Sequence, residues 1–274
     1  MSSSRKKKTN KQLKTYLAIL ASVLAVLVLL ALILTLGRYT SEPPVETEPS
    51  ETIPPETTTE ATEFTYDETF PTDPAVDSRL GIDVSEHQKN IDWGQVKAAG
   101  VDFVMIRLGY RGYTEGRLYM DSYFAQHYRG AKEAGLDVGV YFFSQALTPE
   151  EARAEARFLL TVLGWRDLTM GIAYDWEFVN DNARTAGMDG RTMTDCALAF
   201  CEVITDAGHN PWIYFNQFQA DYYYILEELS DYDFWFAKYT EELDCPVPID
   251  MWQYTGNGSV PGIDVPVDMN LYWP

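Results

Sequence analysis

The sequence has few of the residues that build covalent or metal-centred sites. Among 274 residues there are three cysteines and three histidines, and none of their spacings resembles a zinc site. Cys196 and Cys201 are five residues apart in a predicted helix and point to different sides. This pattern favours core-filling thiols, and one disulfide with Cys245 is the alternative. The sequence predicts no metal and no cofactor.

Basic residues are also scarce. The chain has 21 Lys and Arg against 41 Asp and Glu, which gives a formal net charge of −20. Residues 79–274 contribute about −16 of this charge, which excludes a polyanionic partner such as nucleic acid. Neutral glycans are compatible with it, and the 18 tyrosines and 7 tryptophans suit them, because flat rings cover the apolar faces of sugars. The sequence indicates no protein partner.

The N-terminal region has the pattern of a membrane anchor. A basic tail over residues 1–15 precedes an uncharged apolar run from Tyr16 to Leu36, which is long enough to cross a hydrocarbon core. We therefore predict a transmembrane signal-anchor helix over residues 16–37. Because the basic cluster precedes the span, the N-terminus is expected in the cytoplasm and everything after Arg38 outside it. The alternative is a cleaved signal peptide and a secreted protein.

Residues 38–78 have the composition of a linker. They are rich in Glu, Thr and Pro, and no basic residue lies between Arg38 and Arg79. Such a segment cannot bury enough apolar surface to offset its ordering entropy. Proline and like-charge repulsion keep it extended. We predict a disordered spacer with a reach on the order of 100 Å.

The remaining residues, 79–274, are enough for one core and too few for two ordinary domains. Apolar strands alternate with helices, which indicates a parallel sheet covered by helices. We expect a shortened TIM-like β/α barrel of about eight strands and five helices. The expected strands are 80–84, 102–108, 137–143, 171–176, 211–215, 234–237, 250–253 and 263–267, and the expected helices are 93–99, 122–134, 149–163, 194–207 and 220–229.

The fourth predicted strand leads into the run Ala173-Tyr174-Asp175-Trp176-Glu177. Strand alternation puts Asp175 and Glu177 on one side and the two aromatic residues on the other. Ionising both of two neighbouring carboxyl groups costs electrostatic free energy, so the pKa of one of them is raised and that group tends to keep its proton at neutral pH. A proton donor beside a charged carboxylate is what glycosidic-bond cleavage requires. The alternative is two solvated acids where a strand meets a loop.

Other polar and aromatic residues recur where the predicted strands end. In β/α barrels these ends share one mouth, which carries the functional groups. The recurrence therefore favours an active site over scattered loop acids. For each aromatic residue taken singly, barrel filling is an equal alternative. The residues concerned are Asp83, Tyr141, Tyr214, Trp252, Gln253 and Asp268.

Two further features are interpreted separately. His87 is expected to be a buried, hydrogen-bonded histidine rather than a catalytic residue. The run Tyr222-Tyr223-Tyr224 is either a sugar-binding rim or a loop packed on the barrel.

Six motifs occur in order along residues 80–274. They are Gly81-Ile82-Asp83-Val84-Ser85 with His87-Gln88, Phe103-Val104-Met105-Ile106-Arg107, Gly139-Val140-Tyr141-Phe142, Asp175-Trp176-Glu177, Trp252-Gln253-Tyr254 and Val267-Asp268-Met269-Asn270. This ordered set resembles glycoside hydrolase family 25, the muramidases that cut peptidoglycan. The fold of that family resembles the shortened barrel expected here.

The resemblance implies hydrolysis of the β-1,4 bond between N-acetylmuramic acid and N-acetylglucosamine in peptidoglycan glycan strands. Glu177 matches the general acid, and Asp175 matches the carboxylate that supports charge on the sugar ring or on the substrate acetamido group. Retaining, inverting and acetamido-assisted routes all stay open. The residues expected to bind substrate or support the site are Asp83, Asp268, Tyr141, Tyr214, Trp252 and Gln253.

Two other functions compete with a muramidase tethered to the cell membrane and facing the wall. One is a non-catalytic cell-wall glycan-binding module on the same fold, and the presence of all four acids weakens it. The other is a glycosidase acting on chitin-like chains, which share the acetamido sugar backbone. The anchor and spacer would hold a muramidase within reach of the wall, where it would remodel peptidoglycan.

Overall fold

The computed structural model describes residues 78–240 and 243–274. Within them the strands are β1 (Arg79–Val84), β2 (Phe103–Arg111), β3 (Leu118–Met120), β4 (Asp137–Ser144), β5 (Ile172–Trp176), β6 (Pro211–Asn216), β7 (Asp233–Ala237), β8 (Met251–Gly258) and β9 (Val267–Tyr272). The helices are α2 (Trp93–Ala98), α3 (Phe124–Glu133), α4 (Pro149–Leu163), α5 (Gly190–Asp206) and α6 (Gln217–Tyr222), with the 3-10 turns η1 (Glu86–Gln88) and η2 (Leu226–Leu229).

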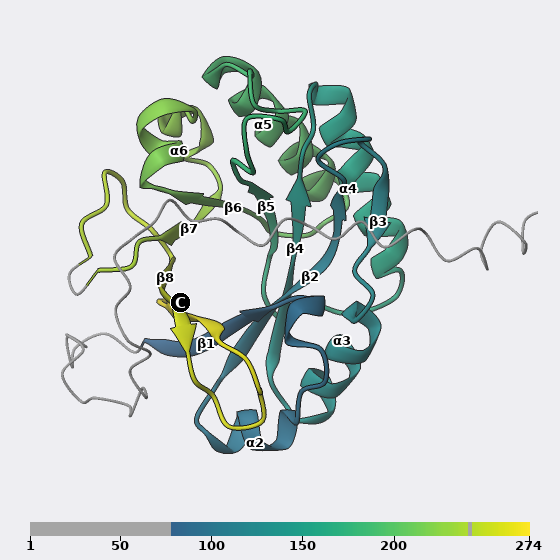
Figure 1. The fold of residues 1–274 in the computed structure, drawn as a ribbon, viewed down its shortest axis with the longest axis vertical. Helices are drawn as coiled ribbons and strands as arrows, with labels where there is room; N and C mark the ends of the chain where they lie inside the picture. The colour runs from purple at the N-terminus through teal and green to yellow at the C-terminus, as the bar shows by residue number, and fades with distance from the viewer. Residues whose placement is uncertain (1–77, 241–242) are drawn as a thin grey trace, which may run out of the picture. The chain divides into compact units, whose positions relative to one another are not determined.

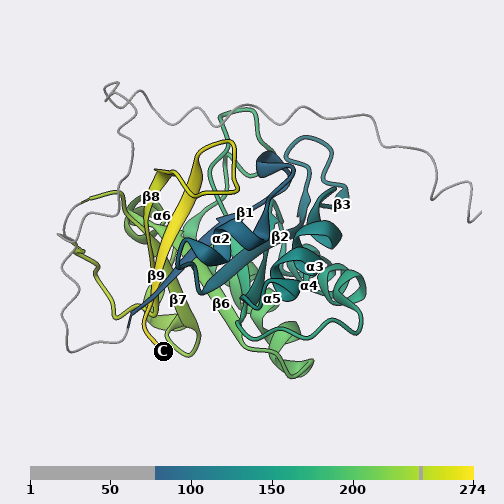
Figure 2. The ribbon, with the colours of Figure 1, turned by 90° about the horizontal axis from the view of Figure 1, so that it is seen from below.

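Eight of these strands close into a barrel. Their hydrogen-bonded order is β1-β9-β8-β7-β6-β5-β4-β2, and β1 also pairs with β2, which joins the two ends. From β1 to β8 the barrel neighbours are parallel, as the sequence predicts. β9 is antiparallel to both β1 and β8, and Figure 2 shows it in yellow beside them. The short β3 pairs with β2 outside the closed circle.

The helices cover part of the outside of the barrel. In Figure 1, α3, α4 and α5 lie against the outer surface of the strands from β2 to β6. Helix α4 starts at Pro149, a residue preorganised for a first helical position, and Thr148 Oγ1 accepts a hydrogen bond of 3.2 Å from the Glu151 amide. The described residues after β7 contain no helix, so the barrel is shortened as expected.

Alternation along the strands produces two apolar layers. The outer layer, between strands and helices, includes Tyr174 and Trp176. At the start of β2, a Cβ on the neighbouring Gly81 would lie 2.2 Å from the ring of Phe103, so only glycine fits at position 81. A packed interior leaves the polar chemistry to the mouth. The inner cluster consists of Phe103, Met105, Ala173, Trp212, Tyr214, Trp235, Ala237 and Met251.

The predicted last strand, residues 263–267, is wrong. The chain turns at Pro261 and Gly262, where the φ of Gly262 is +97°, and it bends again at residues 264–265. The alternating Ile263, Val265 and Val267 imitate a strand, but only Val267 belongs to one, because β9 starts at that residue. The parallel sheet expected from the sequence extends from β1 to β8, and β9 departs from it by running antiparallel to both of its neighbours.

Two smaller predictions also need correction. The expected helix over residues 220–229 is two short elements, α6 and η2, separated by three residues. Strand β3 was not predicted, because three residues carry too little alternation to be recognised.

No helix within residues 78–240 and 243–274 combines the length and the apolar character needed to cross a membrane. The predicted basic tail (1–15), transmembrane helix (16–37) and nearly all of the linker (38–78) lie outside the described residues.

Candidate active site

The end of β5 brings one predicted acid to the barrel mouth and the other directly after it. Asp175 is the fourth of the five residues of β5 and is 4% exposed, and Glu177 follows the strand and is half-buried. Tyr174 and Trp176 are fully buried in the outer apolar layer. The predicted alternation is therefore confirmed within β5, where the two aromatic residues pack on the side away from Ala173 and Asp175.

Asp83 and Asp268 are directly opposite residues on β1 and β9. Asp83 is buried, and Asp268 is half-buried. Because β9 runs antiparallel, Asp268 lies near the start of its strand and yet at the mouth formed by the ends of the parallel strands. The sequence predicted Asp268 to follow the last strand, and the structure corrects this: it is the second residue of β9.

Buried side chains hold the carboxylate of Asp83 in place. Its Oδ2 accepts hydrogen bonds from Gln253 Nε2 at 2.8 Å and from Asn270 Nδ2 at 2.9 Å. Asn270 Oδ1 in turn accepts from Trp235 Nε1 at 2.8 Å. Gln253 Oε1 accepts from the hydroxyls of Tyr214 at 3.2 Å and Tyr239 at 2.8 Å. Such a satisfied network fixes the orientation of every amide in it.

Sequence reasoning selected Gln253 and Tyr214 from this network and missed Asn270, Trp235 and Tyr239. An available signal was Asn270 itself, a polar residue inside the apolar last strand that is fully buried. Nothing in the sequence marks Trp235, because a tryptophan between Phe234 and Phe236 is indistinguishable from core packing.

The two predicted tyrosines lie among the acids. Burial raises the pKa of the Tyr141 hydroxyl well above its ordinary value; the charge of Arg107 opposes the shift, and Asp83, Asp175 and Asp268 add to it. Burial likewise raises the pKa of Tyr214, with contributions from Glu177, Asp175 and Asp83. Asp83 and Asp175 act on both hydroxyls, whereas Asp268 acts on Tyr141 and Glu177 on Tyr214, which agrees with the position of the four acids at the mouth end of their strands.

The ring of Trp235 contacts both of these tyrosines inside the barrel. The ring of Trp235 meets Tyr214 edge-on at 5.0 Å between centroids and Tyr141 at 5.9 Å. On the β8 side, a Cβ on Gly256 would lie 3.1 Å from Asp268 Oδ1 and 3.3 Å from the Tyr239 hydroxyl. The absence of a side chain at Gly256 therefore leaves room for Asp268 and Tyr239 to approach the same point.

Trp252 is not brought to this space. It lies in the outer apolar layer, on the face of β8 opposite Gln253. Its Nε1 donates a hydrogen bond of 2.8 Å to the carbonyl of Lys238. This placement corresponds to the packing alternative rather than to a sugar contact.

The remaining sequence interpretations are resolved in part. His87 is exposed, so the expectation of a buried histidine is wrong at that position. Tyr224 is buried against Trp176, whereas Tyr222 is 70% exposed, so the tyrosine run both packs on the barrel and reaches solvent.

Cys196, Cys201 and Cys245 are free thiols, and the first two are buried in the core as predicted. Among the described residues, no group of three or more His, Cys, Asp or Glu is arranged to hold a metal.

Comparison with known proteins gives a consistent result. The family described as "Glycosyl hydrolases family 25" matches residues 82–263. An autolytic lysozyme of Clostridium acetobutylicum is 27% identical over 194 residues, covering 70% of this chain and 55% of the relative. Lysozyme M1 of Streptomyces globisporus is 42% identical over 65 residues, which are 24% of this chain and 20% of the relative.

Solved structures agree with the barrel. The modular autolysin LytC of Streptococcus pneumoniae, solved with a synthetic peptidoglycan ligand, has a TM-score of 0.63 and 27% identity; the alignment covers 72% of this chain and 47% of LytC. A bacterial lysozyme from Streptomyces coelicolor has a TM-score of 0.58 and 25% identity; the alignment covers 71% of this chain and 91% of that lysozyme. The chain thus spans about half the length of the autolytic lysozyme and of LytC.

Proposed function

The chain belongs to glycosyl hydrolases family 25, and on that basis we propose that it is a membrane-tethered peptidoglycan hydrolase. The bond it cleaves is the β-1,4 bond between N-acetylmuramic acid and N-acetylglucosamine. The lysozymes it resembles, and an N,O-diacetylmuramidase of Arthroderma benhamiae that is 28% identical over 137 residues, support the enzyme class of a lysozyme or muramidase.

One observation carries this proposal. Acids from three separate parts of the chain lie at the end of the closed barrel where the parallel strands finish. Two of them, Asp175 and Glu177, come from β5 and its end, and Asp83 and Asp268 come from the paired strands β1 and β9. A glycan-binding module needs aromatic faces and hydrogen bonds, but it does not need four clustered carboxylates.

The roles follow from position. Glu177, which is half-buried just beyond β5, protonates the departing sugar oxygen. Asp175, buried beside it, supports the positive charge that develops on the ring or the acetamido group of the substrate. Asp83, whose carboxylate accepts two amide hydrogen bonds, orients the substrate together with Asp268.

Tethering is the second part of the proposal. The apolar run from Tyr16 to Leu36 and its preceding basic cluster support a single span with the barrel outside the membrane. The acidic linker supports a spacer that carries the barrel to the wall. Deletion of residues 41–77 is expected to leave activity on isolated peptidoglycan intact and to reduce wall cleavage in cells; full wall activity of this deletion in cells contradicts the spacer role.

Mass spectrometry of digested peptidoglycan tests the bond assignment. The proposal predicts soluble muropeptides that end in a reducing N-acetylmuramic acid. Products that end in reducing N-acetylglucosamine would assign cleavage to the other glycosidic bond. Faster cleavage of chitooligosaccharides than of peptidoglycan would assign a different substrate, and muropeptide binding without products from a folded protein would identify a binding module.

A further inference from the structure

The backbone that carries Glu177 is held by side chains rather than by the sheet. The last residue of β5 that pairs with β4 is Trp176, and the last that pairs with β6 is Asp175. Beyond these pairs two glutamine side chains donate to consecutive carbonyls. Gln219 Nε2 donates to the carbonyl of Trp176, and Gln145 Nε2 donates to the carbonyl of Glu177 at 3.0 Å.

The two glutamines come from the segments that follow the strands on either side of β5. Gln145 is the residue directly after β4, and Gln219 lies in α6, directly after β6. Both are buried, with 0% and 1% of their surface exposed. They extend the hydrogen bonding of the sheet past its last backbone pairs, one from each neighbouring strand.

The rest of each amide is also engaged, which fixes its orientation. Gln145 Oε1 accepts a hydrogen bond of 2.7 Å from the hydroxyl of Thr185, and Gln219 Oε1 accepts one of 2.6 Å from the backbone amide of Asn216. A backbone carbonyl only accepts, and a backbone amide only donates. Each Nε2 must therefore face β5, and flipping either amide would place two acceptors together.

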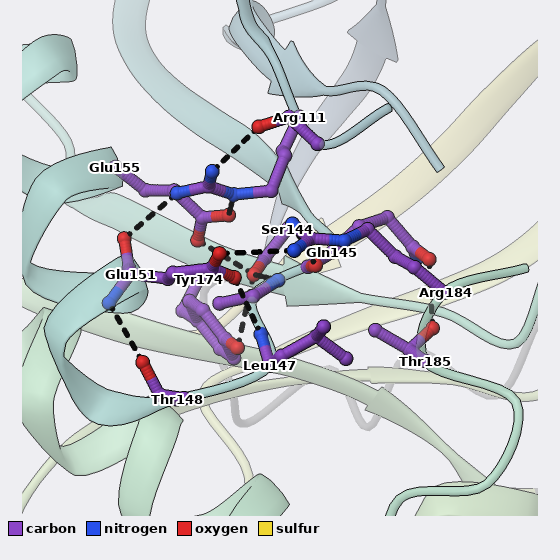
Figure 3. A network of polar contacts seen from close by, with 12 residues as sticks. Arg111, Ser144, Gln145, Leu147, Thr148, Glu151, Glu155, Tyr174, Arg184 and Thr185 are labelled. Carbon is purple, nitrogen blue, oxygen red and sulfur yellow. Dashed lines mark hydrogen bonds and ion pairs between the residues drawn. The ribbon is translucent and has the colours of Figure 1, made fainter. Parts of the chain in front are cut away.

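A polar network ties Gln145 to α4, as Figure 3 shows. Arg184 donates from Nη1 to the Gln145 carbonyl at 3.2 Å and from Nη2 to Glu151 Oε1 at 2.9 Å. The backbone carbonyl of Glu151 accepts a hydrogen bond of 3.0 Å from Arg111. The guanidinium of Arg111 also forms an ion pair of 2.6 Å with the fully buried Glu155. Gln145 is thus fixed relative to a whole helix and not only to its own loop.

We propose that Gln145 and Gln219 are positioning residues that set the direction of the Glu177 side chain for proton transfer, and the inference rests on the proposed function. The carbonyls of Trp176 and Glu177 belong to the two peptide planes that flank the Cα of Glu177. Fixing both planes fixes the direction in which its Cβ leaves the backbone. An acid misplaced by about 1 Å can lose on the order of 100-fold in rate.

The test compares two substrates whose leaving groups differ in their need for a proton. Gln145→Met and Gln219→Met remove the donor and keep a side chain of similar length. On peptidoglycan fragments we expect kcat to fall about 10- to 100-fold with KM nearly unchanged. On a dinitrophenyl glycoside of the same sugars, whose leaving group departs without protonation, we expect rates close to those of the unaltered full chain.

Matched controls separate positioning from damage to the fold. Gln217→Met makes the same exchange two residues earlier in α6, where the half-buried side chain donates a hydrogen bond of 2.9 Å to Asp221 and not to the backbone of β5, and we expect no change. Gln145→Glu is isosteric and regains a donor when it is protonated. Its rate relative to the unaltered chain should rise as the pH falls, so a Met variant that fails to fold does not remove the test.

Each outcome is decisive. Equal loss on both substrates, or no loss on peptidoglycan fragments, overturns the positioning role while leaving the proposed function standing. An unaltered chain that is folded and cleaves neither substrate overturns the proposed function, and the positioning role with it.

Discussion

Gln253 Nε2 lies 2.8 Å from Asp83 Oδ2, and the oxygen of the same amide accepts the hydroxyls of Tyr214 and Tyr239. One glutamine at the end of the barrel thus connects the charged side of the mouth to its aromatic side. An amide suits this position because it offers a donor to the carboxylate and an acceptor to the hydroxyls.

Replacing this amide with an acid is expected to destabilise the protein. Gln253→Glu removes the donor and places a second carboxylate against the buried Asp83. We expect a loss of about 3 kcal/mol in the free energy of unfolding at neutral pH. The introduced carboxyl has a raised folded pKa, so the lost stability returns as the pH falls and the pair takes up a proton. Urea denaturation at acidic and neutral pH measures this.

The control for this prediction is Gln253→Met, which loses the hydrogen bonds without adding charge. It should be destabilised by a smaller amount that does not depend on pH in this way. Gln253→Glu with unaltered stability at neutral pH contradicts the observed contact.

Two aromatic substitutions should separate catalysis from packing. Tyr214→Phe removes a hydroxyl that lies among the acids of the mouth and bonds Gln253, and kcat/KM is expected to fall about tenfold. Trp252→Phe removes an indole N–H that bonds the Lys238 carbonyl in the outer layer. It should cost about 1–3 kcal/mol of stability and leave kcat/KM of the folded protein unchanged. The reverse pattern would assign Trp252 to the substrate.

The buried Glu155 predicts a pH-dependent stability term. Burial raises its pKa from 4.5 to about 7, although Arg111 and Ser144 each bond it at 2.6 Å. A raised carboxyl pKa stabilises the fold fully below 4.5, and this contribution is lost as the pH rises through 7. The lost contribution is up to about 3 kcal/mol.

Glu155→Gln keeps the shape of the side chain and removes the titration. Its stability relative to the unaltered chain should therefore increase between pH 4.5 and 7. Thermal unfolding across this interval provides the measurement. Two parallel stability curves would show that the carboxyl does not titrate there.

The sequence predicts the barrel well wherever local pattern determines structure. Helix α4, with proline at its first residue, is predicted to the residue, and the alternation of Asp175 and Trp176 along β5 is confirmed. The direction of β9 could not be predicted, because a strand has the same alternation in either direction. Only pairing with β1, far away in the chain, shows that Asp268 faces Asp83.

The site is only partly predictable for a related reason. Its acids follow recognisable motifs, but the residues that hold them are ordinary glutamines, an asparagine and a tryptophan. Gln145 and Gln219 acquire their position beside β5 only when the neighbouring strands pair. The exposure of His87 is likewise set by the turn η1, whose capping box uses Ser85 and Gln88.

The proposed mechanism depends on Glu177 as the proton donor, and Glu177→Gln keeps the shape of this side chain while removing its transferable proton. The measurement is the rate at which the full chain and this variant release muropeptides from purified peptidoglycan, with folding checked by circular dichroism. We expect a folded variant whose rate is lower by about 10²- to 10⁴-fold. A folded Glu177→Gln protein that releases muropeptides at the unaltered rate would contradict it.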